Sequence, residues 1–260
     1  CFSFGIAEQD MVGSAAGMAT MGLIPFVNSY AMFIAMRGLD QVRNIVAYPN
    51  FNVKFVLSHY GLDAGSDGVT HQLTEDIAIF RSIPHLKLLQ PADANEMKQI
   101  IDYAVDVNGP MVIKSGKSES MDVHNSNYKF EYGVPSIISP GDEVAIITNG
   151  TMVEHAITAK KTIDKNGSRV KIINMSSLTD INIDALLDYT EGCKHLVTLE
   201  DHSIFGGIGG IVSEIMASNR PIKVKRLGLG REFAECGSPR DLYDAYGMSQ
   251  KDIISAVEDI

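Results

Sequence analysis

The amino-acid sequence alternates between short apolar runs, which suit buried strands, and longer segments with helical periodicity. In the first half, strands are expected at 24–28, 53–58, 86–90 and 111–115, and helices at 6–21, 31–47, 73–82 and 93–107. In the second half, strands are expected at 143–148, 169–174, 195–200 and 222–227, and helices at 151–165, 183–190, 207–218, 239–246 and 250–259. This alternation predicts an α/β fold with open, mostly parallel sheets covered by helices on both faces.

The polar segment 116–133, GKSESMDVHNSNYKFEYG, interrupts the alternation. It is rich in Ser and Asn and has no helical period, which is typical of a linker. A chain of 260 residues can bury two modest cores as well as one large core. We therefore expect two domains, at 1–118 and 135–260, joined by a linker at 119–134.

Charge and cysteine content narrow the classes of partner and compartment. A formal net charge of −10, without any cluster of Lys and Arg, argues against a nucleic-acid partner. The three cysteines, Cys1, Cys193 and Cys236, are odd in number and have no CxxC spacing, so neither a disulfide framework nor a zinc ribbon is indicated. These features are typical of a reducing compartment, and we expect a cytoplasmic location.

Residues 11–36 carry no charged side chain, which raises the question of a membrane span. Gly22, Pro25 and Asn28 break the run into a helix, a short strand and the start of another helix. We therefore expect no membrane partner and interpret the run as core at a domain or subunit contact. No secretion signal is visible, and a segment upstream of Cys1 is expected to be missing.

The stretch SHYGLDAGSDGVTHQ, residues 58–72, is too long for an ordinary connection between a strand and a helix. Long structured loops at the carboxyl ends of parallel strands often form sites in α/β proteins. His59, Asp67 and His71 supply groups that titrate or accept hydrogen bonds. Their spacing differs from that of zinc sites, so we favour a proton-handling or hydroxyl-binding loop over a metal site or a plain surface loop.

Glu8 lies in the first turns of an expected helix whose later turns are uncharged. Such a carboxylate is either exposed near the helix N-terminus, where the helix dipole favours it, or buried with a function. A buried carboxyl can exchange a proton near neutral pH. Tyr30 and Phe33, three residues apart at the expected start of the next helix, suit either the core or the wall of a site for a flat ring.

The run EDHSIFGGIGG, residues 200–210, follows a strand and opens a helix, as a dinucleotide-binding motif does. Counted from Gly207, however, Val212 stands where the last glycine is required. We interpret these glycines as positions of close packing between helix and sheet. A serine nucleophile is not indicated either, because the sequence has no GxSxG motif.

Several motifs together resemble the transketolase family: GIAEQDMVGSAAGMA, SYAMF, SHYGLDAGSDGVTHQLTEDIAIFRSIP, LQPADANE, VTLEDHSIFGGIGG and GSPRDLYDAYGMS. They stand in the family's order and cover nearly the whole chain. The resemblance implies a pyrimidine-binding domain of the thiamine-diphosphate fold, followed by a transketolase C-terminal domain, as in the C-terminal subunit of split transketolases. The strand and helix that precede GIAEQ in the family's pyrimidine domain are absent from this sequence.

The resemblance implies a cofactor site. Glu8 matches the glutamate that hydrogen-bonds the aminopyrimidine ring of thiamine diphosphate and promotes loss of the thiazolium proton, which is general acid–base chemistry. Tyr30 and Phe33 match the aromatic pair that packs on that ring. The motif that binds the diphosphate and the metal, GDG followed by an asparagine, is absent from this sequence.

The resemblance also implies a substrate site. His59 and His71 match histidines that bind substrate oxygens and relay protons, and Asp67 matches the acid that binds a sugar hydroxyl. The family's phosphate-binding arginine aligns best with Lys117, which attracts phosphate but lacks the planar bidentate geometry of arginine. Sugar phosphates are therefore the expected substrates. Because a lysine stands at this position, the sequence supports a phosphate requirement less strongly than it supports the reaction class.

The implied activity is transfer of a two-carbon ketol unit from a ketose to an aldose. It requires an N-terminal diphosphate-binding subunit, which holds most of the thiamine diphosphate and Mg²⁺ or Ca²⁺. The two subunits are expected to associate further into a dimer of heterodimers. No metal ligand is assigned to this chain. Deoxyxylulose-phosphate synthase, the β subunit of a 2-oxoacid dehydrogenase and a non-catalytic assembly subunit remain alternatives. The other histidines are expected to be structural or solvent-exposed: His85, His124, His155, His195 and His202.

Overall fold

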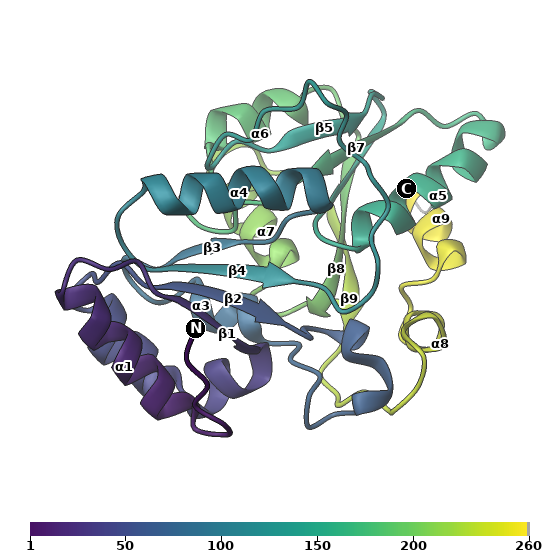
Figure 1. Cartoon of the computed structure of the whole chain (residues 1–260). Helices are drawn as coiled ribbons and strands as arrows, with labels where there is room; N and C mark the ends of the chain where they lie inside the picture. Colours follow the sequence, from purple (N-terminus) through teal and green to yellow (C-terminus); the bar gives the residue numbers. More distant parts are fainter. Residues whose placement is uncertain (259–260) are drawn as a thin grey trace.

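The predicted alternation folds into two open sheets (Figure 1). The computed structural model of the chain describes residues 1–258. The first sheet is parallel throughout, in the order β1 (Phe26–Tyr30), β2 (Lys54–Ser58), β4 (Met111–Ser115) and β3 (Lys87–Leu89). The order in the second sheet is β5 (Ser136–Ser139), β7 (Val170–Asn174), β6 (Val144–Thr148), β8 (His195–Ser203) and β9 (Val224–Leu229). The predicted α/β class with two mainly parallel sheets is confirmed.

Helices cover both faces of each sheet, as Figure 1 shows for α4 and α1 on opposite sides of the first sheet. The helices of the first half are α1 (Glu8–Thr20), α2 (Leu39–Gln41), α3 (Asp76–Phe80) and α4 (Ala94–Asp106). Those of the second half are α5 (Met152–Ile163), α6 (Ile183–Tyr189), α7 (Ile208–Asn219), α8 (Pro239–Ala245) and α9 (Gln250–Glu258). The last position of the helix expected at 250–259 lies outside the described residues.

One apolar core runs through both sheets. Val12 of α1 and Phe55 of β2 belong to the same buried cluster as Ile147 of β6 and Leu196 of β8. A second cluster lies among α5, α8, α9 and the second sheet, and it includes Leu62 from the loop after β2. The C-terminal half therefore packs directly on the loop that carries the predicted site.

The helix expected at 31–47 is not one regular α-helix, which corrects the prediction. Two π-helical segments, η1 (Phe33–Arg37) and η2 (Val42–Ala47), flank the short α2, and the N–H of Gly38 donates to the carbonyl oxygen of Phe33, five residues earlier, at 2.9 Å. A π-turn accommodates an extra residue, and such turns are frequent at functional sites. Tyr30 is the last residue of β1 and does not begin a helix, because β1 starts two residues later than expected.

Other expected elements differ in length. The helix expected at 73–82 is reduced to α3, because Leu73 forms an isolated bridge with Tyr60 and extends the backbone there. The edge strand β5, which pairs antiparallel with β7, was not predicted. The helix expected at 93–107 corresponds to α4, and Asp93 caps its start by accepting a hydrogen bond from the N–H of Glu96 at 2.8 Å. The domain boundaries at 118 and 135 stay predictions; the chain between β4 and β5 crosses from one sheet to the other there.

Candidate active site

The predicted site residues gather at the carboxyl edge of the first sheet. Tyr30 ends β1, His59 directly follows β2, and Lys117 lies two residues after β4. These strands are parallel and adjacent, and Ser58 is in register with both Tyr30 and Ser115. Residues that leave parallel strands in register emerge at one edge of the sheet, which is where open α/β proteins bind ligands.

Four aromatic and imidazole rings form one cluster at this edge. The rings of Tyr30 and His59 stack with centroids 4.0 Å apart, and the ring of Phe33 lies nearly parallel to Tyr30 at 5.9 Å. His71 meets Tyr30 and Phe33 edge-on, at 5.7 Å and 5.3 Å. His59 adopts a positive φ of 62°, which is unusual for a residue with a side chain. The long loop thus folds both of its histidines back onto the aromatic pair.

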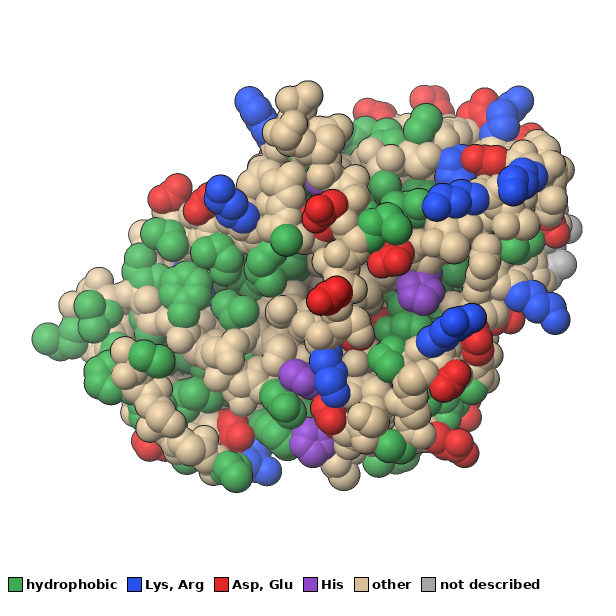
Figure 2. Space-filling view, turned by 45° about the vertical axis from the view of Figure 1, so that its right-hand side comes forward, with side chains coloured by type: hydrophobic (Ala, Val, Ile, Leu, Met, Phe, Trp, Pro, Cys, Tyr) green, Lys and Arg blue, Asp and Glu red, His purple; other side chains and the backbone are tan. Residues whose placement is uncertain are grey.

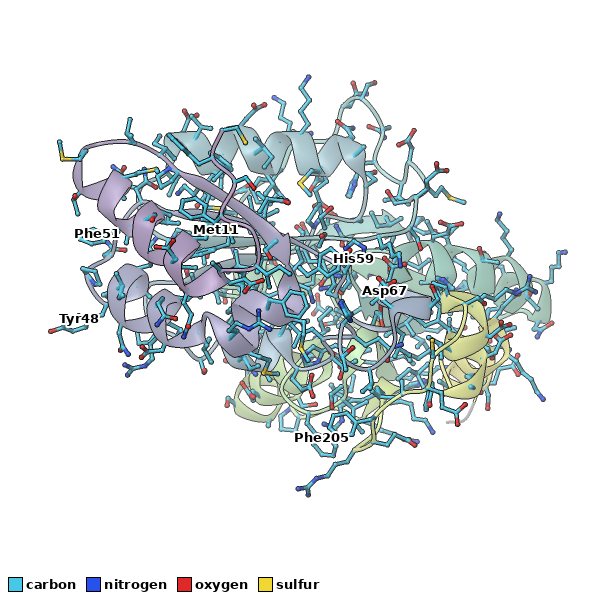
Figure 3. All side chains as sticks on the ribbon, turned by 60° about the horizontal axis from the view of Figure 1, so that its bottom comes forward. Met11, Tyr48, Phe51, His59, Asp67 and Phe205 are labelled. Carbon is cyan, nitrogen blue, oxygen red and sulfur yellow. The ribbon has the colours of Figure 1, made fainter. Side chains whose placement is uncertain are left out.

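A charged group borders these rings. Lys117 Nζ donates to Asp67 Oδ2 and to the carbonyl oxygen of Ala64, both at 2.9 Å, and His59 Nε2 lies 3.9 Å from Asp67 Oδ2. Figure 3 shows His59 and Asp67 near each other where the loop meets the C-terminal half. The hydrogen bond from Lys117 lowers the pKa of Asp67. An anion that binds Lys117 must therefore compete with an ionised carboxylate.

Burial and then the charge of Lys117 lower the pKa of His59, although Asp67 opposes this shift. The imidazole is consequently neutral at neutral pH, with one nitrogen able to accept a proton. Its Nδ1 lies 2.9 Å from Ser58 Oγ. The geometry gives His59 a nitrogen that can serve as a base and a hydroxyl that can orient the ring.

Glu8 is buried, so the interpretation of this carboxylate as an exposed helix-terminal group is wrong. Its side chain is 5% exposed at the first residue of α1, and its Oε2 accepts a hydrogen bond from Nη1 of Arg37 at 2.8 Å. The Arg37 guanidinium also lies over the ring of Phe33, 5.1 Å from its centroid. Arg37 thus connects the carboxylate to the ring cluster.

Sequence reasoning missed Arg37, Asp63 and Asp201. Arg37 is the first basic residue of the chain and ends the uncharged run, which is a signal that could have been used. Asp63 accepts hydrogen bonds from the backbone N–H groups of Lys117 and Ser118, at 2.5 Å and 3.1 Å. Asp201 binds the same loop from the second sheet. No local pattern distinguishes these two aspartates, because their partners are distant in the sequence.

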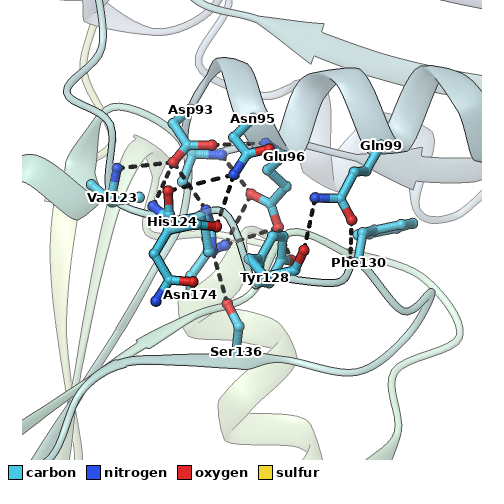
Figure 4. A network of polar contacts seen from close by, with 12 residues as sticks. Asp93, Asn95, Glu96, Gln99, Val123, His124, Tyr128, Phe130, Ser136 and Asn174 are labelled. Atoms are coloured by element: carbon cyan, nitrogen blue, oxygen red, sulfur yellow. Dashed lines mark hydrogen bonds and ion pairs between the residues drawn. The ribbon is translucent and has the colours of Figure 1, made fainter.

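The remaining histidines make other contacts. Figure 4 shows His124 in a polar network at the start of α4, where its Nδ1 lies 3.1 Å from Asp93 Oδ2 and its ring stacks on Tyr128. His202 is fully buried, and its Nδ1 donates to the carbonyl oxygen of Ser203 at 2.6 Å. His195 is buried in β8. The contacts of His124 and His202 are with residues outside the ring cluster.

The run 11–36 is only partly buried. Val12, Ala15 and Ala16 belong to the core, whereas other apolar side chains of the N-terminal half are exposed: Phe2, Ile6, Met21, Leu23, Ile24, Phe26 and Met36. Figure 2 shows hydrophobic side chains gathered on one half of the molecule and charged ones mostly on the other. No helix within residues 1–258 is long and apolar enough to cross a membrane. The same residues contain no group of three or more His, Cys, Asp or Glu suited to a metal ion.

The chain consists of an α/β unit with a cluster of rings at the carboxyl edge of its parallel sheet, followed by a second α/β unit. Residues 1–121 match the pyrimidine-binding domain of transketolase, and residues 133–253 match the transketolase C-terminal domain. The chain belongs to the transketolase family.

Relatives include subunits of divided enzymes. A putative transketolase C-terminal section from Methanocaldococcus jannaschii is 35% identical over 98% of this chain and 81% of its own length. A 6-deoxy-6-sulfo-D-fructose transketolase subunit from Clostridium sp. strain MSTE9 is 31% identical over 98% of this chain and 80% of its own length. A 1-deoxy-D-xylulose-5-phosphate synthase from Clostridium tetani is 32% identical, and this chain spans 41% of its length.

Two solved structures are similar to this chain. A split-gene transketolase, described as an inactive β4 tetramer, is 34% identical and superposes with a TM-score of 0.92 over 99% of this chain and 83% of that one. Transketolase from Campylobacter jejuni, at 18% identity and a TM-score of 0.85, has the same fold over the whole of this chain and 39% of its own. The architecture is therefore that of the C-terminal subunit of a split transketolase.

Proposed function

We propose that this chain is the pyrimidine-binding subunit of a thiamine-diphosphate-dependent transketolase, which moves a two-carbon ketol unit from a ketose to an aldose. The observation that supports this most is the buried carboxylate of Glu8, which Arg37 connects to the ring cluster of Tyr30, Phe33, His59 and His71. Thiamine diphosphate, when bound, supplies the electron sink for cleavage and formation of the carbon–carbon bond.

The residues present fit the aminopyrimidine part of this cofactor. Glu8 offers a carboxylate, 5% exposed, which can hydrogen-bond a ring nitrogen and hold or return its proton. Tyr30 and Phe33 present ring planes within 9° of each other, which suits packing on a flat heterocycle. In this proposal, Glu8 either keeps its hydrogen bond with Arg37 when it binds the cofactor ring, or exchanges that hydrogen bond for one with the ring.

The substrate is proposed to bind beside these rings. His59, with its lowered pKa, and His71 accept and return protons at the sugar oxygens, and Asp67 accepts a hydrogen bond from a sugar hydroxyl. Lys117 attracts the phosphate of a sugar phosphate, in competition with Asp67. A substrate hydroxyl that occupies Asp67 would free the lysine for the phosphate.

The partner is proposed to be an N-terminal, diphosphate-binding transketolase subunit, which holds Mg²⁺ or Ca²⁺, with two such pairs forming a dimer of heterodimers. This rests on the absence of the diphosphate motif from this sequence, on the exposed apolar side chains of the N-terminal half, and on relatives named as subunits or sections. The free thiols of Cys1, Cys193 and Cys236 fit a cytoplasmic location.

The test is reconstitution. Thiamine diphosphate and Mg²⁺ are titrated into the chain alone, and into the chain mixed with a diphosphate-binding subunit, while ketol transfer to an aldose phosphate is followed. We expect weak cofactor binding and no turnover without the partner, and both with it. Efficient transfer by the isolated chain would contradict the partner requirement, and release of CO₂ from pyruvate would favour a synthase-like reaction.

A further inference from the structure

Asp201 belongs to the second sheet, but its carboxylate binds the loop of the first. Its side chain is buried at the carboxyl end of β8. Oδ1 accepts the N–H of Leu62 at 2.7 Å, and Oδ2 accepts the N–H of Asp63 at 3.0 Å. Tyr243 of α8 donates its hydroxyl to the same Oδ2 at 3.0 Å. Two residues of the C-terminal half thus hold one turn of the candidate substrate loop.

The turn is shaped around this carboxylate. Gly61 has a φ of 61°, and a Cβ at this position would lie 2.4 Å from the carboxylate carbon of Asp201. Only glycine adopts this conformation without strain and leaves room for the aspartate. Burial raises the pKa of Asp201 to about 7, so the carboxylate is mainly ionised at pH 8.

The same turn positions Lys117. Asp63 Oδ2 accepts the backbone N–H groups of Lys117 and Ser118, and its Oδ1 accepts the Ser118 hydroxyl. The Nζ of Lys117 in turn donates hydrogen bonds to Ala64 and Asp67 of the loop. The segment after β4 and the loop after β2 are therefore joined through Asp63, whose own backbone is held by Asp201.

We propose that Asp201 and Tyr243 are positioning residues, through which the C-terminal domain sets the geometry of the substrate-binding side chains. They touch neither the ring cluster nor Lys117 directly, and act through Asp63. The part that concerns substrate rests on the proposed function, whereas the part that concerns the loop stands on the contacts alone.

Glu200 provides a matched control. It precedes Asp201 on β8, is equally buried, and accepts the N–H groups of Ile208 and Gly209 at 2.6 Å and 2.9 Å. These donors belong to α7 in its own domain. Glu200→Gln therefore replaces a buried acid of the same strand without touching the loop.

The first measurement is amide hydrogen exchange on the isolated chain at pH 8. Asp201→Asn replaces an acceptor by an amide donor, so exchange at Leu62, Asp63 and Lys117 should become roughly ten-fold faster or more. Tyr243→Phe should have a smaller effect in the same direction, and it keeps the proposal testable if Asp201→Asn does not fold. Unchanged loop exchange in the folded variants, or equal acceleration in Glu200→Gln, would overturn the proposal.

The second measurement uses the complex reconstituted with the diphosphate-binding subunit. Tyr243→Phe and Asp201→Asn should raise KM for a sugar phosphate, by roughly ten-fold for the latter, while kcat and thiamine diphosphate affinity stay within about two-fold. Faster loop exchange with an unchanged KM would overturn the role in substrate binding. Absence of turnover in the unmodified complex would count against the proposed function, and loop exchange alone would then decide the role of Asp201.

Discussion

Arg37 and Glu8 form an ion pair across 29 positions of the chain, with Nη1 and Oε2 2.8 Å apart. The carboxylate is buried, whereas the guanidinium side chain is 48% exposed. The pair joins the π-helical η1 to the first turn of α1. Because Glu8 is the proposed partner of the cofactor ring, cofactor binding and this ion pair are coupled through one carboxylate.

Arg37→Gln should lower the free energy of unfolding by about 1–2 kcal/mol, because the buried carboxylate loses its charged partner while solvent already screens the guanidinium. Urea unfolding of Arg37→Gln, Glu8→Gln and the double variant measures the coupling. Arg43→Gln, at an exposed arginine whose Nη1 donates to the neighbouring Asn44 Oδ1 at 2.6 Å, serves as the control. Additive effects of the two single variants would contradict a coupled pair.

Glu8→Gln should abolish most turnover of the reconstituted complex. The amide keeps the size of the side chain but cannot hold and return a proton, and general acid–base groups typically contribute about 10²–10⁴-fold. Exchange of the thiazolium carbon's proton for deuterium, followed by NMR after rapid quench, should slow in parallel. Normal exchange in Glu8→Gln would remove Glu8 from the site.

Lys117→Ala should raise KM for phosphorylated sugars more than for unphosphorylated analogues. One charge-assisted hydrogen bond contributes about 1.5–3 kcal/mol, which corresponds to roughly ten- to a hundred-fold. Lys98→Ala, at an exposed lysine of α4, is the control for net charge. Equal losses with both substrate types would remove Lys117 from the phosphate site.

The pKa of His59 should respond to Lys117 and Asp67 in opposite directions. Lys117→Ala should raise it and Asp67→Asn should lower it further, because a cation disfavours imidazolium and a carboxylate favours it. NMR titration of the isolated chain tests this, and His155, whose pKa burial also lowers, should not respond. Because the folded pKa of His59 lies below the unfolded value, its contribution to stability is lost as the pH falls through that folded pKa.

Lys114→Met should destabilise the chain by about 3–5 kcal/mol, because it leaves Asp76 buried without its cation. The Nζ of Lys114 lies 2.8 Å from Asp76 Oδ2, and both side chains are at most 1% exposed. The double variant Asp76→Asn/Lys114→Met should recover part of the loss. Denaturant unfolding provides the measurement, and a loss below about 1 kcal/mol would show that the carboxylate finds another partner.

The local pattern of the sequence predicted the alternation of strands and helices. The resemblance to the transketolase family assigned Tyr30, His59 and Lys117 to one site, and they lie at one edge because each ends or follows a neighbouring parallel strand. The π-turns of η1 could not be predicted, because the periodicity of 31–47 equally suits an α-helix and tertiary contacts select between them. Glu8 pairs with Arg37, and the backbone of residues 62–63 pairs with Asp201. These contacts could not be predicted either, because they depend on how whole elements pack.

The apolar cluster shared by the two sheets makes the polar linker a poor place to divide the chain. Leu88 and Leu178 lie in this cluster and are joined by a backbone hydrogen bond of 2.9 Å from one half to the other. A cut between the halves would turn this internal surface into an exposed one, so neither fragment would be expected to fold alone. Chimeras of related chains would have to exchange both faces of this internal surface together.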